Sequence, residues 1–312
     1  MCKVTISAFD FLKKFPDAKT AQDYLEKRRW NGSPSCPKCS SKDRIQARKL
    51  EGGYYRCLAC KFDFTVRTGT IFERSHVPLD KWLFAFYLVV TSRKGISSLQ
   101  LSKELGVTQK TAWFMLQRIR EACGNDNNDD DTSGGFLKGI IEADETYIGG
   151  KEKNKHASKK LKLSKGGVGK TIVFGMLQRG GKVKTQIIPG TSTAVIQGAI
   201  KASVEPGSTL CSDEHSAYKG MPEFTHKVVT HSAKQFVDGM AHTNGIESVW
   251  ALLKRGFYGV YHSFSAKHLQ RYLDEVTARL HEGNVKIHTM DRIDALLGKA
   301  SGVRLTYQGL IG

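Results

Sequence analysis

The chain has no long apolar run and no secretory signal. Its longest uninterrupted apolar run, 82–90, spans nine residues, whereas a transmembrane helix needs roughly 20. The N-terminal stretch MCKVTISAFDFLKKF lacks the apolar segment and the small-residue cleavage site of a secretory signal. The sequence therefore predicts no membrane partner and a cytoplasmic location.

Acidic residues are also scarce, because 30 Asp+Glu stand against 48 Lys+Arg and give a net charge of +18. A surplus of this size favours a polyanionic partner, most often nucleic acid. Hydrophobic residues make up 40% of the 312 residues and charged residues 25%, which suffices for a folded core and excludes wholesale disorder. The length indicates two or three domains.

Cysteine is limited to seven residues, and we expect no disulfides in a reducing compartment. Four of them form two close pairs, Cys36 with Cys39 and Cys57 with Cys60. Each pair puts two thiolates on one turn, and two such turns complete a closed tetrahedral site for structural Zn²⁺. Strand-like stretches at 54–56 and 62–66 make this region a zinc ribbon. A redox C-x-x-C motif is the alternative, but such a motif has a single cysteine pair and requires a βαβ context.

Residues 76–122 predict helices, and their second half has the more specific pattern. Residues 99–105 form one helix, 106–107 a tight turn, and Thr108 the N-cap of a second helix. This arrangement matches a helix-turn-helix whose second helix enters the major groove of DNA. The outer positions of that helix are Gln109, Lys110, Gln117, Arg118 and Arg120. An ordinary helical hairpin is the alternative.

Residues 124–135, GNDNNDDDTSGG, lack periodicity and indicate an acidic linker, with a cation site as the weaker alternative. Beyond the linker the pattern changes to strands and helices. The expected strands are 136–142, 171–178, 183–188, 208–212 and 227–230, and the expected helices are 193–204 and 245–281. Three adjacent strands, a helix, two strands and a helix is the order of an RNase H-like domain.

Two aspartates, Asp144 and Asp213, each follow a short apolar strand. Carboxylates at the ends of neighbouring strands are held rigidly and can point at one locus. A third acid, Glu247, lies on a predicted helix, with Lys254 two turns later on the same face. Mg²⁺ prefers carboxylate oxygens, and such ions activate an attacking hydroxyl and stabilise the leaving oxygen in phosphoryl transfer.

Each acid taken singly is a weak signal, because a surface carboxylate has the same local sequence. The neighbouring acids with the same ambiguity are Glu142, Glu145 and Glu214. His242 is a candidate neighbour of the predicted active site. No ligand spacing assigns a role to His215, His226 or His231.

The stretch 165–171, KGGVGKT, looks like the phosphate loop of a Walker-type, ParA-like ATPase. Such a loop must follow a buried strand and open a helix, but here a basic polar stretch precedes it and strand-like residues follow. Ser164 also stands where the motif requires Gly. We therefore expect no ATP binding, and the basic stretch beyond Asp144 instead favours a loop that meets DNA phosphates. Its basic residues are Lys151, Lys153, Lys155, His156, Lys159, Lys160, Lys162, Lys165 and Lys170.

Three motifs together resemble a known family: DETYIGGKEKNKH at 144–156, SDEHSAY at 212–218, and HTNGIESVW at 242–250 followed by Lys254. They are similar to motifs of the transposases of the IS1595 group of bacterial insertion sequences, which carry an ISXO2-like domain. The resemblance includes the zinc ribbon and covers nearly the whole chain. Its DETYIGG block is the most specific part.

The resemblance implies an RNase H-like DDE recombinase, a Mg²⁺- or Mn²⁺-dependent DNA transposase. Such an enzyme binds the terminal inverted repeats of its element, nicks them, and joins the new 3′-hydroxyl ends to target DNA as a homo-oligomer. By position, Asp144 and Asp213 match the first two metal-binding aspartates, and Glu247 matches the third acid. Lys254 matches a lysine that contacts a DNA phosphate. Asn244 is the rival for the third position, because an Asn-containing version exists in this group, although a carboxylate binds Mg²⁺ better than an amide does.

We therefore expect an α/β chain with a zinc ribbon, a helix-turn-helix connector and an RNase H-like catalytic domain, acting on double-stranded DNA at the nucleoid. The expected segments are an N-terminal helical segment 1–30, the ribbon 31–72, the helical DNA-binding region 76–123, the linker 124–135, the catalytic domain 136–283 and a C-terminal tail 284–312. Outside the basic loop, the expected DNA contacts are Lys110, Arg118 and Lys254. The alternative is a DNA-binding regulator with the same architecture and a catalytically inactive RNase H-like domain.

Overall fold

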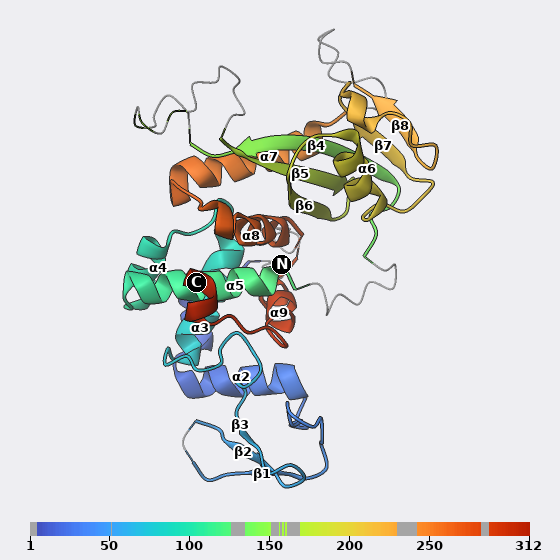
Figure 1. Ribbon diagram of the computed structural model, residues 1–312. Coiled ribbons are helices and arrows are strands. Elements are labelled where there is room, and N and C mark those ends of the chain that lie inside the picture. The colour runs from blue at the N-terminus through green and yellow to red at the C-terminus, as the bar shows by residue number, and fades with distance from the viewer. Residues whose placement is uncertain are drawn as a thin grey trace. The chain divides into compact units, whose positions relative to one another are not determined.

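The computed structural model describes residues 5–50, 52–125, 135–150, 169–229, 242–281 and 287–312, together with His156, Ser158 and Lys160. The chain divides into two compact units (Figure 1). Unit 1 comprises Met1–Asn128 and Glu282–Gly312, and unit 2 comprises Asp129–His281. No helix in the described part of the chain is long and apolar enough to cross a membrane.

The regular secondary structure of unit 1 is mainly helical. Its helices are α1 (Ala8–Lys14), α2 (Ala18–Trp30), α3 (Leu79–Thr91), α4 (Ser98–Leu105), α5 (Gln109–Cys123), α9 (Thr289–Gly298) and α10 (Tyr307–Ile311). The apolar α3 is central, since its residues Trp82, Leu83 and Phe86 are each at most 1% exposed. Helix α9 packs against both α3 and α5. The C-terminal segment, which the sequence describes only as a tail, therefore contributes to the core of this unit.

The zinc ribbon of unit 1 is a small antiparallel sheet in the order β1-β2-β3. Its strands are β1 (Ile45–Ala47), β2 (Tyr55–Cys57) and β3 (Asp63–Phe64). Trp30, at the end of α2, packs edge-on against Tyr55 and Phe64. Aromatic pairs of this geometry bury much apolar area, so they fix the ribbon to α2.

Helices α4 and α5 are joined by a tight turn, as the sequence predicts. Gly106 ends α4 with a φ of 60°, a conformation that favours glycine, and Thr108 caps α5 by accepting a hydrogen bond from the Thr111 amide. The prediction that this face of α5 is exposed is wrong beyond the first turn of the helix. Helices α3, α4 and α9 pack around α5 and bury three polar residues to 8% exposure or less, namely Gln117, Arg118 and Arg120.

Unit 2 is built on a five-stranded sheet in the order β6-β5-β4-β7-β8. Its elements are β4 (Ile140–Ile148), β5 (Thr171–Gln178), β6 (Val183–Ile188), α6 (Thr193–Lys201), β7 (Thr209–Ser212), β8 (Thr225–Val228), α7 (Asn244–Gly256) and α8 (Leu269–His281). Strands β4, β5 and β6 pair antiparallel, whereas β7 runs parallel to both β4 and β8. This order and polarity is the RNase H-like arrangement that the sequence predicts.

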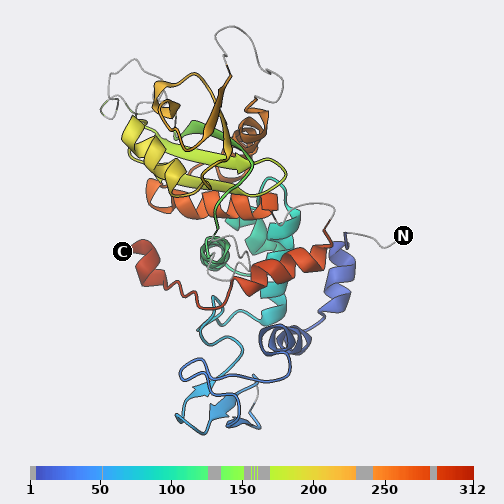
Figure 2. The ribbon, with the colours of Figure 1, turned by 90° about the vertical axis from the view of Figure 1, so that its right-hand side faces the viewer.

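The two faces of this sheet carry separate cores. Helix α6 covers one face, where Ile141, Phe174 and Ile196 are fully buried. Helices α7 and α8 cover the other face with Trp250 and Leu273, and Figure 2 shows α6 and the two orange helices on different sides of the sheet. Because side chains alternate along a strand, the even-numbered residues of β4 face α7.

Several predicted elements of unit 2 have different bounds in the structure, and two of them differ most. The first strand continues past residue 142 to Ile148, because it pairs with β5 along its whole second half. The single helix predicted over 245–281 is two helices, separated by a π-helical turn at Phe257–Tyr261 and by His262. His262 has a left-handed φ of 59°, which no α-helix can contain.

Candidate functional site

The four paired cysteines converge in unit 1. The Sγ atoms of Cys36 and Cys60 are 3.6 Å apart, as are those of Cys39 and Cys57, and all four lie within 4.8 Å of one another. Sulfurs bound at about 2.3 Å to a tetrahedral Zn²⁺ would be about 3.8 Å apart. The ribbon therefore fits one closed Zn²⁺ site.

The two aspartates singled out by the sequence are neighbours in unit 2. Asp144 lies in the middle of β4 opposite Gly175, rather than at a strand end as predicted. On its other side β4 runs parallel to β7, with Glu142 opposite Cys211. Extending this register by two residues puts Asp144 beside Asp213, the first residue after β7.

Asp144 is tied to helix α7 by Trp250, whose Nε1 donates a hydrogen bond to Oδ2 of Asp144 at 2.9 Å. This contact depends on the glycine at position 175. A Cβ atom on Gly175 would lie 2.4 Å from Cη2 of Trp250. The indole, only 4% exposed, therefore occupies the space that a side chain on β5 would fill.

The environment of Asp144 disfavours its negative charge. Its pKa is raised to about 6, mainly by burial and further by the charges of Glu145 and Asp213. The hydrogen bond from Trp250 acts in the opposite direction. Carboxylates crowded in this way are stabilised by a bound divalent cation, and their oxygens are the ligands that Mg²⁺ prefers.

Glu145, the residue after Asp144, contributes to the same acidic cluster from the opposite side of β4. Its Oε1 accepts a hydrogen bond of 2.8 Å from the hydroxyl of Tyr218. Burial raises the pKa of Glu145, and the charge of Asp213 adds to the effect. Asp213 itself accepts a hydrogen bond from the His215 amide at 3.1 Å, which shapes the turn after β7. Glu214 is exposed.

Glu247 and Lys254 line one hollow of about 470 Å³ together with Asp144. The other lining residues are Glu145, Thr146, Trp250 and Ala251. Asp213 is not one of the described residues that line this hollow, and the strand register gives its position instead. Two turns of α7 thus place an acid and a cation on the side of Asp144, as the spacing predicts.

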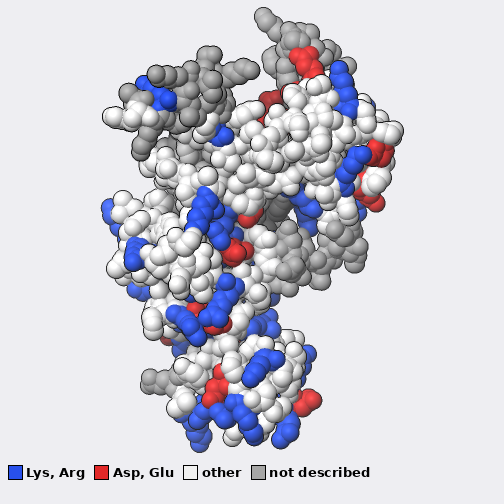
Figure 3. Space-filling view, viewed as in Figure 1, with Lys and Arg blue, Asp and Glu red and all other residues white. Residues whose placement is uncertain are grey.

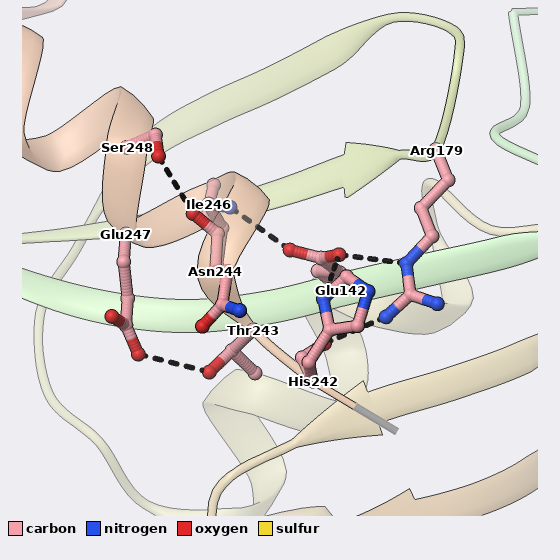
Figure 4. Close-up of polar contacts among 8 residues, drawn as sticks. All are labelled: Glu142, Arg179, His242, Thr243, Asn244, Ile246, Glu247 and Ser248. Atoms are coloured by element: carbon pink, nitrogen blue, oxygen red, sulfur yellow. Dashed lines mark hydrogen bonds and ion pairs between the residues drawn. The ribbon is translucent and has the colours of Figure 1, made fainter. Parts of the chain in front are cut away.

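The orientation of Glu247 is set at the start of α7. The hydroxyl of Thr243 donates to Oε1 of Glu247 at 3.1 Å. Asn244, the rival for the third acidic position, is exposed at the first position of the helix, and its backbone carbonyl accepts a hydrogen bond from Ser248 (Figure 4). The choice of Glu247 over Asn244 stays a prediction.

Glu142, which the sequence does not distinguish from a surface charge, is 1% exposed. Its Oε1 is 2.7 Å from Nε of Arg179 and 3.1 Å from Nδ1 of His242. Its Oε2 accepts a hydrogen bond from the Ile246 amide at 3.0 Å, and Arg179 also donates to the His242 carbonyl at 2.8 Å (Figure 4). Local sequence carries no signal for this network, because its partners are distant along the chain.

The predicted DNA-contact residues differ in whether the structure describes them and in whether they are exposed. Lys151, Lys153, Lys155 and Lys159 lie outside the described residues, whereas Lys160 and Lys110 are exposed. The prediction for Arg118 is wrong, because its guanidinium is buried and donates to the carbonyls of Leu305 and Ile71. Burial also lowers the pKa of Arg118.

Of the four histidines named from the sequence, His231 lies outside the described residues. His226 contacts the hydroxyl of Ser212 at 2.9 Å, and its pKa is lowered by burial. His242 belongs to the Glu142 network. The ATPase-like stretch leads at Thr171 into strand β5 and not into the helix that a phosphate loop requires.

Comparison with protein families matches both units. The ISXO2-like transposase domain matches residues 136–280, and the transposase zinc-ribbon domain matches residues 16–62. A protein of transposable element ISH50 from Halobacterium salinarum is 30% identical over 263 residues, covering 78% of this chain and 84% of that protein. A transposase-like protein from Haemophilus influenzae is 27% identical over 107 residues, covering 34% of this chain and 85% of that protein.

Among solved structures, the chain matches Mos1 transposase. In the pre-cleavage transpososome the match has 12% identity and a TM-score of 0.29, covering 69% of this chain and 76% of that chain. In the strand transfer complex the match has 12% identity and a TM-score of 0.30, covering 69% of this chain and 75% of that chain. At such low TM-scores the RNase H-like assignment rests on the sheet order and polarity alone.

Proposed function

The chain belongs to the IS1595 family of transposases, and on this premise we propose that it is a DDE-type enzyme that cuts and joins DNA with Mg²⁺ or Mn²⁺. Its substrates in this proposal are the terminal inverted repeats of its own element and a target duplex. Asp144, Asp213 and Glu247 hold the metal, and Lys254 binds a phosphate of the DNA. The alternative, a DNA-binding regulator with an inactive catalytic domain, has no observation of its own in its favour.

The register that brings Asp144 beside Asp213 is the observation that carries this proposal. Burial, and further the charges of Glu145 and Asp213, raise the pKa of Asp144 to about 6, and carboxylates perturbed in this way cluster at functional sites. Glu247 adds a third carboxylate from α7, where it lines one hollow together with Asp144. A divalent cation bound there supplies activation of the attacking hydroxyl and stabilisation of the leaving oxygen. Lys254 is exposed on the same face of α7 as Glu247, and in this proposal it neutralises a DNA phosphate.

We also propose that helices α4 and α5 form a DNA-binding helix-turn-helix. The tight turn at Gly106 and the cap at Thr108 support this role. Only the first turn of α5 is suited to base contacts, since Gln109 and Lys110 are exposed there, and the N-terminal residues of recognition helices make such contacts. Buried Arg118 is not part of this surface.

The zinc ribbon supplies a second basic surface for DNA phosphates in this proposal. Figure 3 shows Lys and Arg side chains gathered over the ribbon, with few acids between them. Its exposed basic residues are Lys38, Lys42, Arg44, Arg48, Lys49 and Lys61. Phosphate contacts of this kind position a protein on DNA without reading sequence, and they weaken steeply with salt.

The proposal is tested by cleavage of a labelled duplex that carries the element's own ends. The zinc-loaded full chain is incubated with Mg²⁺, with Mn²⁺ or without added divalent cation. We expect metal-dependent nicking at the repeat boundary, lost in Asp213→Asn and retained in Glu214→Gln, which removes the adjacent exposed charge. If DNA is bound but never cut in either metal, the regulator becomes the better account.

A further inference from the structure

Strand β4 presents two carboxylates to helix α7, because Glu142 and Asp144 are two residues apart and share a face. Each is bonded to the helix. The Ile246 amide donates to Oε2 of Glu142 at 3.0 Å, and Nε1 of Trp250 donates to Oδ2 of Asp144 at 2.9 Å. Since residues 246 and 250 are one helical turn apart, these bonds attach one turn of α7 to β4. Glu247 lies within that turn.

Glu142 replaces the missing cap of helix α7. The N-cap residue Thr243 makes no capping hydrogen bond with its side chain, although an N-cap ordinarily accepts from the second or third amide of its helix. Here Glu142 accepts from the third amide, that of Ile246. The hydroxyl of Thr243 does not cap the helix and donates to Glu247, the proposed metal ligand (Figure 4).

The close approach of α7 to Glu142 requires a glycine at the second helical position. A Cβ atom on Gly245 would lie 2.7 Å from Oε2 of Glu142 and 2.5 Å from Cδ2 of Leu177. Glu142 has little room to move, because it is 1% exposed and is held by Arg179. The motif residues Thr243, Gly245 and Glu247 therefore each have a distinct part in seating the start of α7.

Both oxygens of Glu142 are engaged by donors from the protein, so this carboxylate is not available to a metal ion or to DNA. A buried charge of this kind is retained only when it is well paired, and here the pairing joins three distant parts of unit 2: β4, the end of β5 at Arg179, and the start of α7. The arrangement fixes where α7 lies along β4, and with it the distance between Glu247 and Asp144.

We propose that Glu142 is a positioning residue for the metal site, which acts by capping α7 so that Thr243 holds Glu247 toward Asp144. This inference rests on the proposed function, because it assigns Glu247 to metal binding. Partners that orient metal ligands affect metal affinity by about 10- to 100-fold when they are removed. A merely structural Glu142 would change stability and leave metal affinity as it is.

The test measures Mn²⁺ binding to the zinc-loaded full chain without DNA, by electron paramagnetic resonance of the free ion, beside thermal unfolding. We expect Glu142→Ala to raise the Kd for Mn²⁺ by about 10- to 100-fold. Glu142→Gln keeps an acceptor for the Ile246 amide, so it should recover part of the affinity. The control Glu205→Ala removes an exposed charge at the far end of the sheet and should bind Mn²⁺ as the wild type does.

A second pair of variants decides the question if Glu142→Ala does not fold. Thr243→Val removes the hydroxyl that holds Glu247 and preserves the shape of the side chain, whereas Thr243→Ser preserves the hydroxyl. We expect a raised Kd for Mn²⁺ in Thr243→Val with an unchanged melting temperature, and near wild-type binding in Thr243→Ser. Folded Glu142→Ala and Thr243→Val proteins with wild-type Mn²⁺ affinity would overturn the positioning role.

The failure of this inference is distinguishable from failure of the proposed function. Asp144→Asn and Asp213→Asn remove proposed ligands and should weaken Mn²⁺ binding directly. If both bind Mn²⁺ as the wild type does, there is no metal site at these carboxylates and the proposed function itself is refuted. If they lose Mn²⁺ while the Glu142 and Thr243 variants keep it, only the positioning role is refuted.

Discussion

The indole of Trp250 donates a hydrogen bond to the carboxylate of Asp144, with 2.9 Å between Nε1 and Oδ2. This contact links the helix that carries Glu247 to the strand that carries the first aspartate. It also favours the ionised form of a carboxylate whose pKa burial has raised to about 6. Helix packing and the protonation of Asp144 are therefore coupled through one residue pair, and in the proposed function metal binding is coupled to both.

Protons should compete with the metal for Asp144. A carboxylate must be ionised to bind Mn²⁺, so we expect the affinity of the full chain for Mn²⁺ to fall as the pH falls through about 6. In Trp250→Phe the donor is lost and the apolar ring is kept, so the pKa should rise and the midpoint should move to higher pH. Mn²⁺ titrations over a series of pH values measure both. An unchanged midpoint in Trp250→Phe would show that the indole does not govern this proton.

Gly175→Ala should destabilise unit 2. The added Cβ would lie 2.4 Å from Cη2 of the buried Trp250, and overpacking of this kind costs about 1–3 kcal/mol. The matched control is Gly198→Ala, in helix α6, where a Cβ meets nothing within 4 Å. The free energy of unfolding of that variant should rise by about 0.5–1 kcal/mol, because alanine has a higher helix propensity than glycine. Urea unfolding compares the two, and equal stabilities would contradict the packing described.

Much of unit 2 follows from the sequence because its signals are local. Strands β5 and β6 match the predicted ranges 171–178 and 183–188 to the residue, since β5 is a largely apolar run that ends at a glycine-rich turn and β6 begins directly after that turn. The cysteine spacing likewise predicts the ribbon. Asp144, Glu247 and Lys254 line one hollow, and their catalytic roles stay predictions.

What the sequence does not contain is the pairing of distant polar groups. Glu142 is a buried carboxylate because Arg179 and Ile246, 37 and 104 residues away, supply its donors. Arg118 is buried for the same kind of reason, since its carbonyl acceptor on Leu305 is 187 residues away. Helical spacing alone puts Arg118 on an outer face, and tertiary packing overrides it.

The zinc ribbon should contain about one Zn²⁺ per chain, held by four thiolates. Cys57→Ser should lose the metal and lower the melting temperature of unit 1, because the ribbon has little apolar core of its own. Cys211→Ala, which changes a buried cysteine of unit 2, should keep it. Atomic absorption gives the zinc content, and equal zinc in all three proteins would exclude this ligand set.

Substitutions of Lys110 and Arg118 should have different effects, the first on DNA affinity and the second on the free energy of unfolding. Lys110→Ala should leave stability within about 0.5 kcal/mol and reduce the slope of log affinity against log salt by about 1. Arg118→Met should cost about 1.5–3 kcal/mol, because it removes charged donors from the carbonyls of Leu305 and Ile71. Urea unfolding and DNA binding at several salt concentrations measure the two effects. The reverse pattern would restore Arg118 as a DNA contact.

The most direct test of the account is to locate the divalent cation on the protein. Fe²⁺ replaces Mg²⁺ in the zinc-loaded full chain, ascorbate and peroxide generate hydroxyl radicals at the bound ion, and mass spectrometry maps the backbone cuts. We predict cuts near Asp144 and Asp213 that are suppressed by excess Mg²⁺ and lost in Asp213→Asn. Cuts confined to the acidic stretch 124–135, or cuts near the aspartates that persist in Asp213→Asn, would contradict a metal site built by these carboxylates.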